Sequence, residues 1–153
     1  MERSTWDQTW WNVAMEIGDR SRCDGRQIGA VIVTAMNRPV SVGYNGPPAG
    51  FDTSEGPTCQ SFCPRRKTGL QTHDYNNCIS VHAEANALMF ADRRDYEGGT
   101  LYVTSVPCWD CGKMVANSGL KRVVTRVTSE DGHRDPAKTL QLLKDCGLYV
   151  VEL

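Results

Sequence analysis

Apolar positions recur with different periods along the chain, and each period predicts one type of element. Residues 5–21 carry apolar side chains every three to four positions, which predicts an amphipathic helix. We expect its inner face to pack into the core through Trp6, Trp10, Val13, Ala14 and Ile17. The runs QIGAVIVT (27–34) and PVSVGYN (39–45) are short, β-rich and separated by a turn, so they predict a β-hairpin.

The second half of the chain alternates helical and extended patterns. Helices are predicted over about 81–93, 109–118 and 135–146, and strands over 100–105, 122–127 and 148–153. The last helix has clear boundary signals, because Asp135 suits the N-cap, Pro136 the first helical position and Gly147 the C-cap.

The resulting order, α-β-β-α-β-α-β-α-β, is typical of an α/β protein. Strands after the hairpin alternate with helices, so right-handed crossovers should make them parallel to one another. We therefore expect residues 1–153 to form a single domain, a three-layer α-β-α sandwich around a mixed five-stranded sheet.

The stretch from residue 45 to residue 80 does not fit this alternation. Its 36 residues are rich in Gly, Pro and polar side chains and show no periodicity. Loops longer than roughly 12–15 residues are uncommon in compact domains unless they serve a function or are disordered. Because Cys59, Cys63, His73 and Cys78 lie in it, we expect an insertion loop that its cysteines tie down.

Composition narrows the class of protein. Hydrophobic residues make up 40% of the chain and charged residues 23%, and no apolar run approaches the roughly 20 residues that cross a bilayer, so no membrane partner is expected. A net charge of −1 argues against a partner that is polymeric nucleic acid. The N-terminal residues contain no signal-peptide core, so the seven cysteines favour a reducing, cytoplasmic compartment over a disulfide framework.

Two short motifs combine into a candidate metal site. His82 and Glu84 begin one predicted helix, and Cys108 and Cys111 begin the next. Helix N-termini favour thiolates, and one histidine with two cysteines leaves the fourth position of tetrahedral zinc for water, as in catalytic sites. Zinc lowers the pKa of this water and gives a hydroxide nucleophile, and Glu84 is placed to take the proton and deliver it to a substrate.

A family resemblance rests on these same residues. HAE (82–84) followed by PCWDC (107–111) resembles the zinc-dependent nucleobase deaminases. The runs RSRCDGRQIGAVIV, SVGYNGPPAGF and CISVHAEANAL narrow the resemblance to the deoxycytidylate deaminases. The resemblance covers nearly the whole chain. It implies a cytidine deaminase-like fold, zinc on His82, Cys108 and Cys111, Glu84 as proton shuttle, and hydrolysis of dCMP to dUMP and ammonia.

The GYNG stretch is the candidate substrate loop, since the resemblance places Tyr44, Asn45 and Gly46 at the substrate. Glycine lets the backbone approach a ligand closely, and the Asn45 amide offers both a donor and an acceptor. The alternative is a tight turn. Many family members carry Arg where this chain has Ala49, so Arg26 or the basic run at 65–67 becomes the candidate phosphate anchor, unless that run is a solvated loop.

Three functional hypotheses remain open. The first is a deoxycytidylate deaminase, whose substrate is dCMP or a 5-substituted dCMP. The second is another deaminase of the superfamily, acting on a nucleoside such as cytidine, on a pteridine-pathway pyrimidine or on tRNA adenosine. The third is a non-catalytic zinc-binding module, which would have no use for Glu84.

The resemblance also implies assembly and regulation. We expect a homo-oligomer, most simply a hexamer, with dCTP and dTTP as effectors that bind with Mg²⁺. We further expect a second, structural zinc in the loop at 45–80, because some deoxycytidylate deaminases carry one there. Cys23, Cys59 and Cys78 are the first candidate ligands, and Cys63 and His73 compete for the fourth place. The alternative is that these cysteines are small buried apolar residues.

Overall fold

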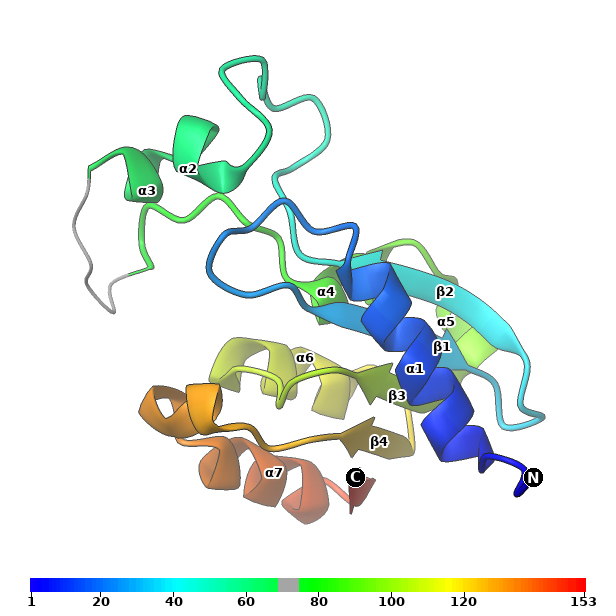
Figure 1. The fold of residues 1–153 in the computed structure, drawn as a ribbon. Coiled ribbons are helices and arrows are strands. Elements are labelled where there is room, and N and C mark those ends of the chain that lie inside the picture. The colour runs from blue at the N-terminus through cyan, green and yellow to red at the C-terminus, as the bar shows by residue number, and fades with distance from the viewer. Residues whose placement is uncertain (69–74) are drawn as a thin grey trace.

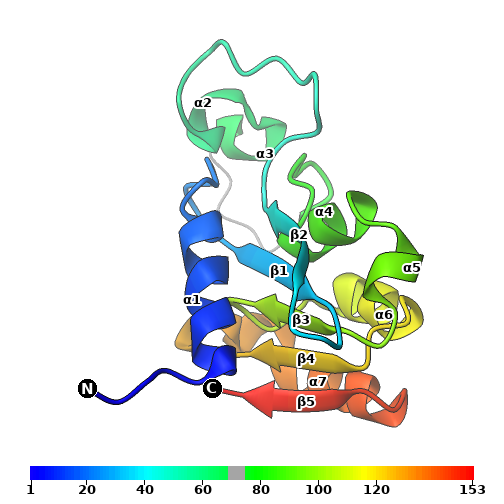
Figure 2. The ribbon, with the colours of Figure 1, turned by 90° about the vertical axis from the view of Figure 1, so that its right-hand side faces the viewer.

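The computed structural model describes residues 1–68 and 75–153. In this part of the chain, five strands form one mixed sheet in the order β2-β1-β3-β4-β5 (Figures 1 and 2). β1 pairs antiparallel with both β2 and β3, whereas β3, β4 and β5 run parallel to one another, as predicted. The strands are β1 (Gly29–Val33), β2 (Pro39–Tyr44), β3 (Thr100–Val103), β4 (Arg122–Thr125) and β5 (Tyr149–Glu152).

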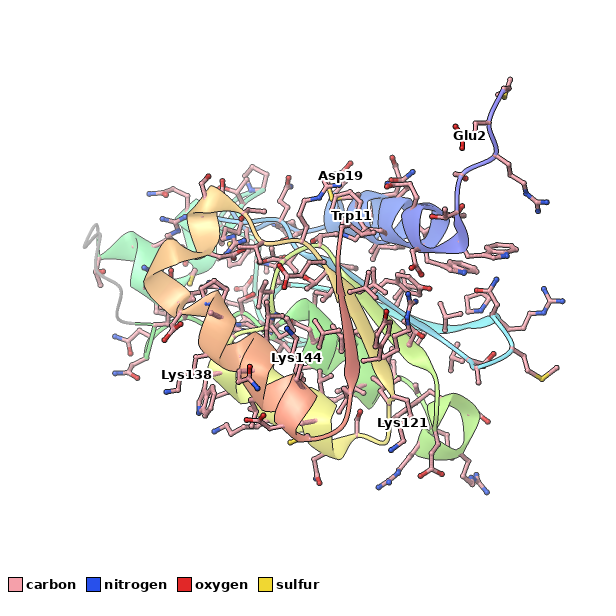
Figure 3. All side chains as sticks on the ribbon, turned by 90° about the horizontal axis from the view of Figure 1, so that it is seen from below. Glu2, Trp11, Asp19, Lys121, Lys138 and Lys144 are labelled. Atoms are coloured by element: carbon pink, nitrogen blue, oxygen red, sulfur yellow. The ribbon has the colours of Figure 1, made fainter. Side chains whose placement is uncertain are left out.

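Helices cover both faces of this sheet, which confirms the three-layer sandwich (Figure 3). The helix α1 (Trp6–Gly18) covers one face, and α4 (Ala83–Met89), α6 (Trp109–Asn117) and α7 (Pro136–Asp145) cover the other. Every residue of β1 is buried, because alternate side chains enter the two core layers. Ala30 and Ile32 pack on the α4–α6–α7 side, and Val31 and Val33 pack against α1.

The predicted first helix is present, but one tryptophan differs from expectation. Trp6 is 54% exposed and stacks on Trp10, so its predicted core role is wrong. The helix starts at Trp6, capped by the Thr5 hydroxyl that accepts from the Gln8 amide, and this first turn lies outside the buried face. Trp11 is buried instead, beneath the guanidinium of Arg126.

The single helix predicted over 81–93 is divided in two. α4 ends at Met89, and a separate turn, α5 (Arg93–Tyr96), follows. The Asp92 carboxylate accepts from the Arg94 amide and so caps the start of a new helix beyond the end of α4. The periodic pattern continued across the break, and for that reason the pattern did not reveal it.

The stretch at 45–80 is not wholly irregular in its described part. Two four-residue helices, α2 (Cys59–Phe62) and α3 (Pro64–Lys67), lie beyond the sheet (Figure 1). A helix of one turn is too short to produce a periodic pattern, so no periodicity predicted either helix. Phe62 is buried between these helices and the chain around Cys23, which gives the insertion a small core of its own.

No helix in the described ranges, 1–68 and 75–153, is both long and apolar enough to span a bilayer.

Candidate active site

The sheet topology gathers four chain segments at one edge. Because β1 runs antiparallel to β2 and β3, and β3 runs parallel to β4, the start of β1 lies beside the ends of the other three. Four segments therefore converge there: residues 22–28, 45–48, 104–108 and 126–134. In α/β sheets, ligands bind outside the carboxyl ends of the strands, and here the N-termini of α4 and α6 open at that edge.

The three predicted metal ligands meet at this edge. His82 is the N-cap of α4 and Cys108 is the N-cap of α6, and Cys111 follows in the first turn of α6. His82 Nδ1 lies 3.4 Å from the sulfur of Cys108 and 3.4 Å from that of Cys111. Among the described residues, this is the set in which three ligand atoms all lie within 4.8 Å of one another. One imidazole and two thiols at this spacing fit zinc.

The three candidate ligands shift one another's pKa values through hydrogen bonds. A hydrogen bond from Cys111, aided by His82, lowers the pKa of Cys108 to about 4. Cys111 donates its thiol proton in this hydrogen bond, and this contact raises the pKa of Cys111 together with burial and the nearby Glu84. Hydrogen bonding to Cys108 raises the pKa of His82 although burial opposes it. The lowered pKa favours the thiolate form of Cys108, which is the form that binds a metal cation.

Glu84 stands in the first turn of α4, two residues after His82, and is only 4% exposed. Burial raises the pKa of its carboxyl group, with partial compensation from a backbone hydrogen bond and from His82. Its side chain contacts Cys111 and lines the same cavity as His82 and Cys108. A carboxyl group with a raised pKa beside a metal site can both accept and return a proton near neutral pH.

A cavity of about 370 Å³ opens above these residues. Three of the four predicted substrate residues, Arg26, Asn45 and Gly46, line it together with the metal site. Tyr44 is not among the lining residues; its side chain is 41% exposed and its carbonyl accepts from the Asn86 amide. The structure therefore brings together most of the predicted substrate loop but leaves Tyr44 outside the cavity wall.

Asn45 and Gly46 hold the cavity wall in place. The Asn45 amide oxygen accepts from the Ile28 backbone, and its amide nitrogen donates to the carbonyl of Arg26, both at 2.8 Å. Gly46 exchanges two backbone hydrogen bonds with Val81, the residue before His82. The loop is thus bonded to the segment that presents the metal ligand, and the role of these residues in binding a substrate remains a prediction.

Gly43 packs a helix rather than a ligand. A Cβ at this position would overlap the carbonyl oxygen of Ala83 and the amide nitrogen of Ala87, both in α4. Only glycine therefore lets β2 and the backbone of α4 touch at this point. The sequence suggested that glycine in this loop lets a ligand approach the backbone. In the structure, Gly43 lets the backbone of α4 approach instead.

The guanidinium of Arg26 already has anionic partners. It lies 2.9 Å from a carboxylate oxygen of Asp131 and 3.3 Å from one of Glu130, and it donates to the Ser105 hydroxyl. Asp131 is 1% exposed and also accepts from Ser105 and from the Thr128 backbone. Arg26 therefore joins the start of β1 to the 3₁₀ helix η1 (Ser129–Arg134) across the cavity.

A second group of sulfur atoms lines the same cavity. Cys59 and Cys63 are buried and pack with Cys23 and Cys78. Hydrogen bonding pairs Cys23 with Cys59 and Cys63 with Cys78. Within the described residues, no three of these sulfurs all lie within 4.8 Å, so the group is wider than the His82 site. His73, the other candidate ligand, lies outside the described residues.

Two further residues of the cavity wall escaped sequence reasoning. Tyr75 and Arg134 line the cavity, and neither belongs to a recognisable motif. The guanidinium of Arg134 stands 5.7 Å from the centre of the Tyr75 ring. Their proximity depends on the fold, since they are far apart in the sequence, and a single basic residue carries no signal of its own.

Comparison with known proteins decides the family. Residues 4–127 match the family model described as the cytidine and deoxycytidylate deaminase zinc-binding region. The chain is 43% identical over 130 residues to the deoxycytidylate deaminase of Mycobacterium phage D29, an alignment that covers 81% of this chain and 96% of the phage protein. The chain belongs to this deaminase family.

Other members of the family extend the comparison. The human deoxycytidylate deaminase is 33% identical over 119 residues, covering 78% of this chain and 63% of the human protein. The crystal structure of the dCMP deaminase from cyanophage S-TIM5 superposes with a TM-score of 0.73 at 25% identity, over 99% of this chain and 100% of that one. The fold predicted from the sequence is therefore the fold of the family.

Proposed function

We propose that this family member is a zinc-dependent hydrolase that converts dCMP and water to dUMP and ammonia. The observation that carries the proposal is the buried carboxyl group of Glu84 beside three zinc-type ligand atoms in one cavity. A site with a purely structural metal has no use for a buried acid that contacts a ligand. The names of the relatives supply the substrate, since those at 33–43% identity are deoxycytidylate deaminases.

His82, Cys108 and Cys111 would hold the zinc ion. Bound zinc supplies the Lewis acidity that makes water a nucleophile near neutral pH. A carboxylate oxygen of Glu84 accepts the proton that the attacking water loses, and the protonated carboxyl returns it to the amine that departs as ammonia. The raised pKa of Glu84 suits both steps, because the group must hold the proton between them.

A single assay tests the substrate. Ammonia release is measured with the zinc-loaded protein on dCMP, CMP, deoxycytidine, dCTP and a 5-substituted dCMP. We expect dCMP to give the highest kcat/KM. A preference for the 5-substituted nucleotide or for a free nucleoside would replace dCMP by that substrate, and no release from any of them would reject the deaminase function.

We also propose that the chain forms one domain and that the insertion at 45–80 binds a second zinc ion. Its ligands would be Cys23, Cys59, Cys63 and Cys78. These four sulfurs share one small core, and a fourth thiolate would close the coordination sphere as structural sites require. The pKa of Cys63 is lowered because backbone amides outweigh burial. The Arg66 side chain hydrogen-bonds Cys59, and a cation there offsets the charge of thiolates. Binding of zinc would draw the two sulfur pairs together.

Assembly, regulation and location complete the proposal. Homo-oligomers, most simply hexamers, would cover the exposed side chains of Met89 and Phe90 at the end of α4, which are 65% and 76% exposed. By resemblance to the family, dCTP with Mg²⁺ would activate the enzyme and dTTP would inhibit it. The protein would act in the cytoplasm. Light scattering with and without each nucleotide tests the assembly, and a monomer unaffected by either would reject it.

A further inference from the structure

Two segments of the cavity wall extend beyond the paired part of the sheet. On the cavity side, the hydrogen bonds between β1 and β3 end with the bond from the Thr104 amide to the Gly29 carbonyl. Beyond it, residues 22–28 follow on one side and residues 105–108 on the other, and the second segment ends at a candidate metal ligand. A side-chain contact joins the two segments, because the guanidinium in the first donates to the serine hydroxyl in the second at 2.6 Å.

The carboxylate of Asp131 holds both partners of this contact, Arg26 and Ser105. One of its oxygens accepts from the Ser105 hydroxyl at 2.9 Å and lies 2.9 Å from a guanidinium nitrogen of Arg26. The other oxygen accepts from the backbone amide and the hydroxyl of Thr128, at 2.8 Å and 3.1 Å. Asp131 is 1% exposed, so these contacts are shielded from water. Arg26, Ser105 and Asp131 therefore contact one another in a closed triangle.

Asp131 is ionised at neutral pH despite its burial. Burial raises the pKa of its carboxyl group, but hydrogen bonds from Thr128, Ser105 and Arg26 outweigh this effect and lower the pKa below the ordinary value. A buried ion is costly unless it is paired with an opposite charge. Movement of Asp131 away from Arg26 would leave a buried carboxylate without its cation, so the triangle resists displacement.

The triangle reaches both segments that supply metal ligands. Ser105 lies three residues before Cys108, on the stretch that leads into α6. On the other side, the carbonyl of Arg26 accepts from the Asn45 amide at 2.8 Å. The next residue of that loop is bonded to the segment that presents His82, as described above. One buried carboxylate thus connects the chain before the first ligand with the chain before the other two.

We propose that Asp131 is a positioning residue of the candidate active site. Its carboxylate holds Ser105 and Arg26 in place and so sets the separation between the segments that carry Cys108 and His82. Asp131 is not among the described residues that line the cavity, so it acts through these neighbours. The inference rests on the proposed function, in which the two segments hold the zinc ion. Reacting groups have to be placed within roughly 0.5 Å, so a residue that fixes the ligand segments affects rate as well as stability.

The test replaces the carboxylate by an amide of the same shape. We expect Asp131→Asn to lower kcat for dCMP by about 10- to 100-fold, and this fall should exceed any rise in KM, because the metal-ligand segments shift relative to each other. Glu130→Gln is the matched control. It makes the same chemical change in the adjacent residue, which faces the same guanidinium of Arg26 but is 68% exposed. This control should keep kcat within about twofold of the wild type.

Cobalt in place of zinc gives a readout that a mere loss of stability would not change. The visible absorption of protein-bound Co²⁺ depends on the geometry of its ligands. We expect Asp131→Asn to shift these absorption bands and Glu130→Gln to leave them in place. Absorption from Co²⁺ bound to the insertion cysteines cancels in the difference spectrum between each variant and the wild type.

Ser105→Ala is the second variant, and it decides the matter if circular dichroism shows that Asp131→Asn does not fold. It removes the hydroxyl that links Asp131 to the Cys108 segment, so it should shift the same cobalt bands. The double variant should lose no more activity than the more impaired single variant, because both changes break one contact. Unchanged cobalt spectra and kcat in the folded variants would overturn the assignment. If the wild type releases no ammonia from dCMP, the proposed function fails, and the cobalt spectra still decide the role of Asp131.

Discussion

Two cysteine-containing regions open onto the same cavity, and they are held in place by different means. The His82 site lies at the edge of a five-stranded sheet whose central strand is buried on both faces. The four-cysteine group lies in an insertion with two one-turn helices and a small core around Phe62. The first region is positioned by the five-stranded sheet before metal binds, whereas the second is held by the small core around Phe62 and by hydrogen bonds to Arg22 and Asp24.

This difference predicts different consequences of losing a metal. Where apolar burial already positions the ligands, loss of the metal should remove catalysis and leave the fold intact. Where it does not, metal binding supplies the free energy that orders the chain, so loss of the metal should unfold it. The contact distances agree, since three ligand atoms lie within 4.8 Å of one another in the first region alone among the described residues. Substitutions and metal removal in the two regions test this contrast.

Glu84→Gln should show the largest effect, a loss of about 100- to 10,000-fold in kcat, because it removes proton transfer. Zinc content should stay at the wild-type level, since the three ligand residues are unchanged. Ammonia release and metal analysis on the same sample provide the measurement. Glu97→Gln is the control, because Glu97 is an exposed partner of Arg93 away from the cavity. Near-normal turnover of Glu84→Gln would remove this residue from the mechanism.

Two cysteine variants compare the regions directly. Wild-type protein should carry about two zinc ions per chain, and Cys59→Ser and Cys108→Ser should each carry about one. Cys108→Ser should lose activity, whereas Cys59→Ser should keep the catalytic zinc and lose stability. Atomic absorption with an activity assay separates the two. A single zinc in freshly purified, unchelated wild type would leave the insertion without its proposed metal.

Chelation should affect the insertion before the sheet. After treatment with a chelator, we expect trypsin to cleave in the basic run at 65–67 faster than at Arg122 or Arg126, by about tenfold relative to zinc-loaded protein. Arg122 is the internal reference because it lies in β4 and pairs with Asp7. Mass spectrometry of the fragments gives the order of cleavage. Equal acceleration at both places would show that the two regions unfold together.

Asp7→Asn should have the smallest effect, about 1 kcal/mol of unfolding free energy at pH 7, because the pair with Arg122 is partly exposed and screened. Its hydrogen bond with Arg122 lowers the pKa of Asp7 despite partial burial. The stabilisation is therefore present above the ordinary aspartate pKa of about 4 and is lost as pH falls below it. Urea unfolding at pH 7 and pH 3 should show a smaller difference between variant and wild type at pH 3, and the two proteins should have equal zinc content at pH 7.

Short-range patterns predicted most of the fold and the metal site. His82 and Glu84 stand together at a helix start, as do Cys108 and Cys111, and local spacing alone defines such positions. The break after Met89 was not predicted, because the apolar periodicity continues across it. The new helix start depends on a single hydrogen bond, from the Arg94 amide to the Asp92 carboxylate.

Features that depend on distant contacts were not predictable in this way. Arg26 was expected at a phosphate, but the fold places Asp131 beside it, and no local pattern links the two. Tyr75 and Arg134 become neighbours only after β4 and the insertion have reached the same sheet edge. Trp6 matches the helical period but is exposed. The period shows which face of a helix is apolar, but it does not show where along the helix burial begins.

The contact at Gly43 has a mechanical consequence. Since the backbone of β2 touches the backbone of α4 there with no side chain between them, the strand acts as a rigid stop for the helix that begins at His82. A single methyl group at this position would displace the whole helix, and His82 and Glu84 would shift together while their chemistry stayed intact. The position of His82 and Glu84 relative to Cys108 and Cys111 is therefore set by a backbone contact that lies outside the candidate site.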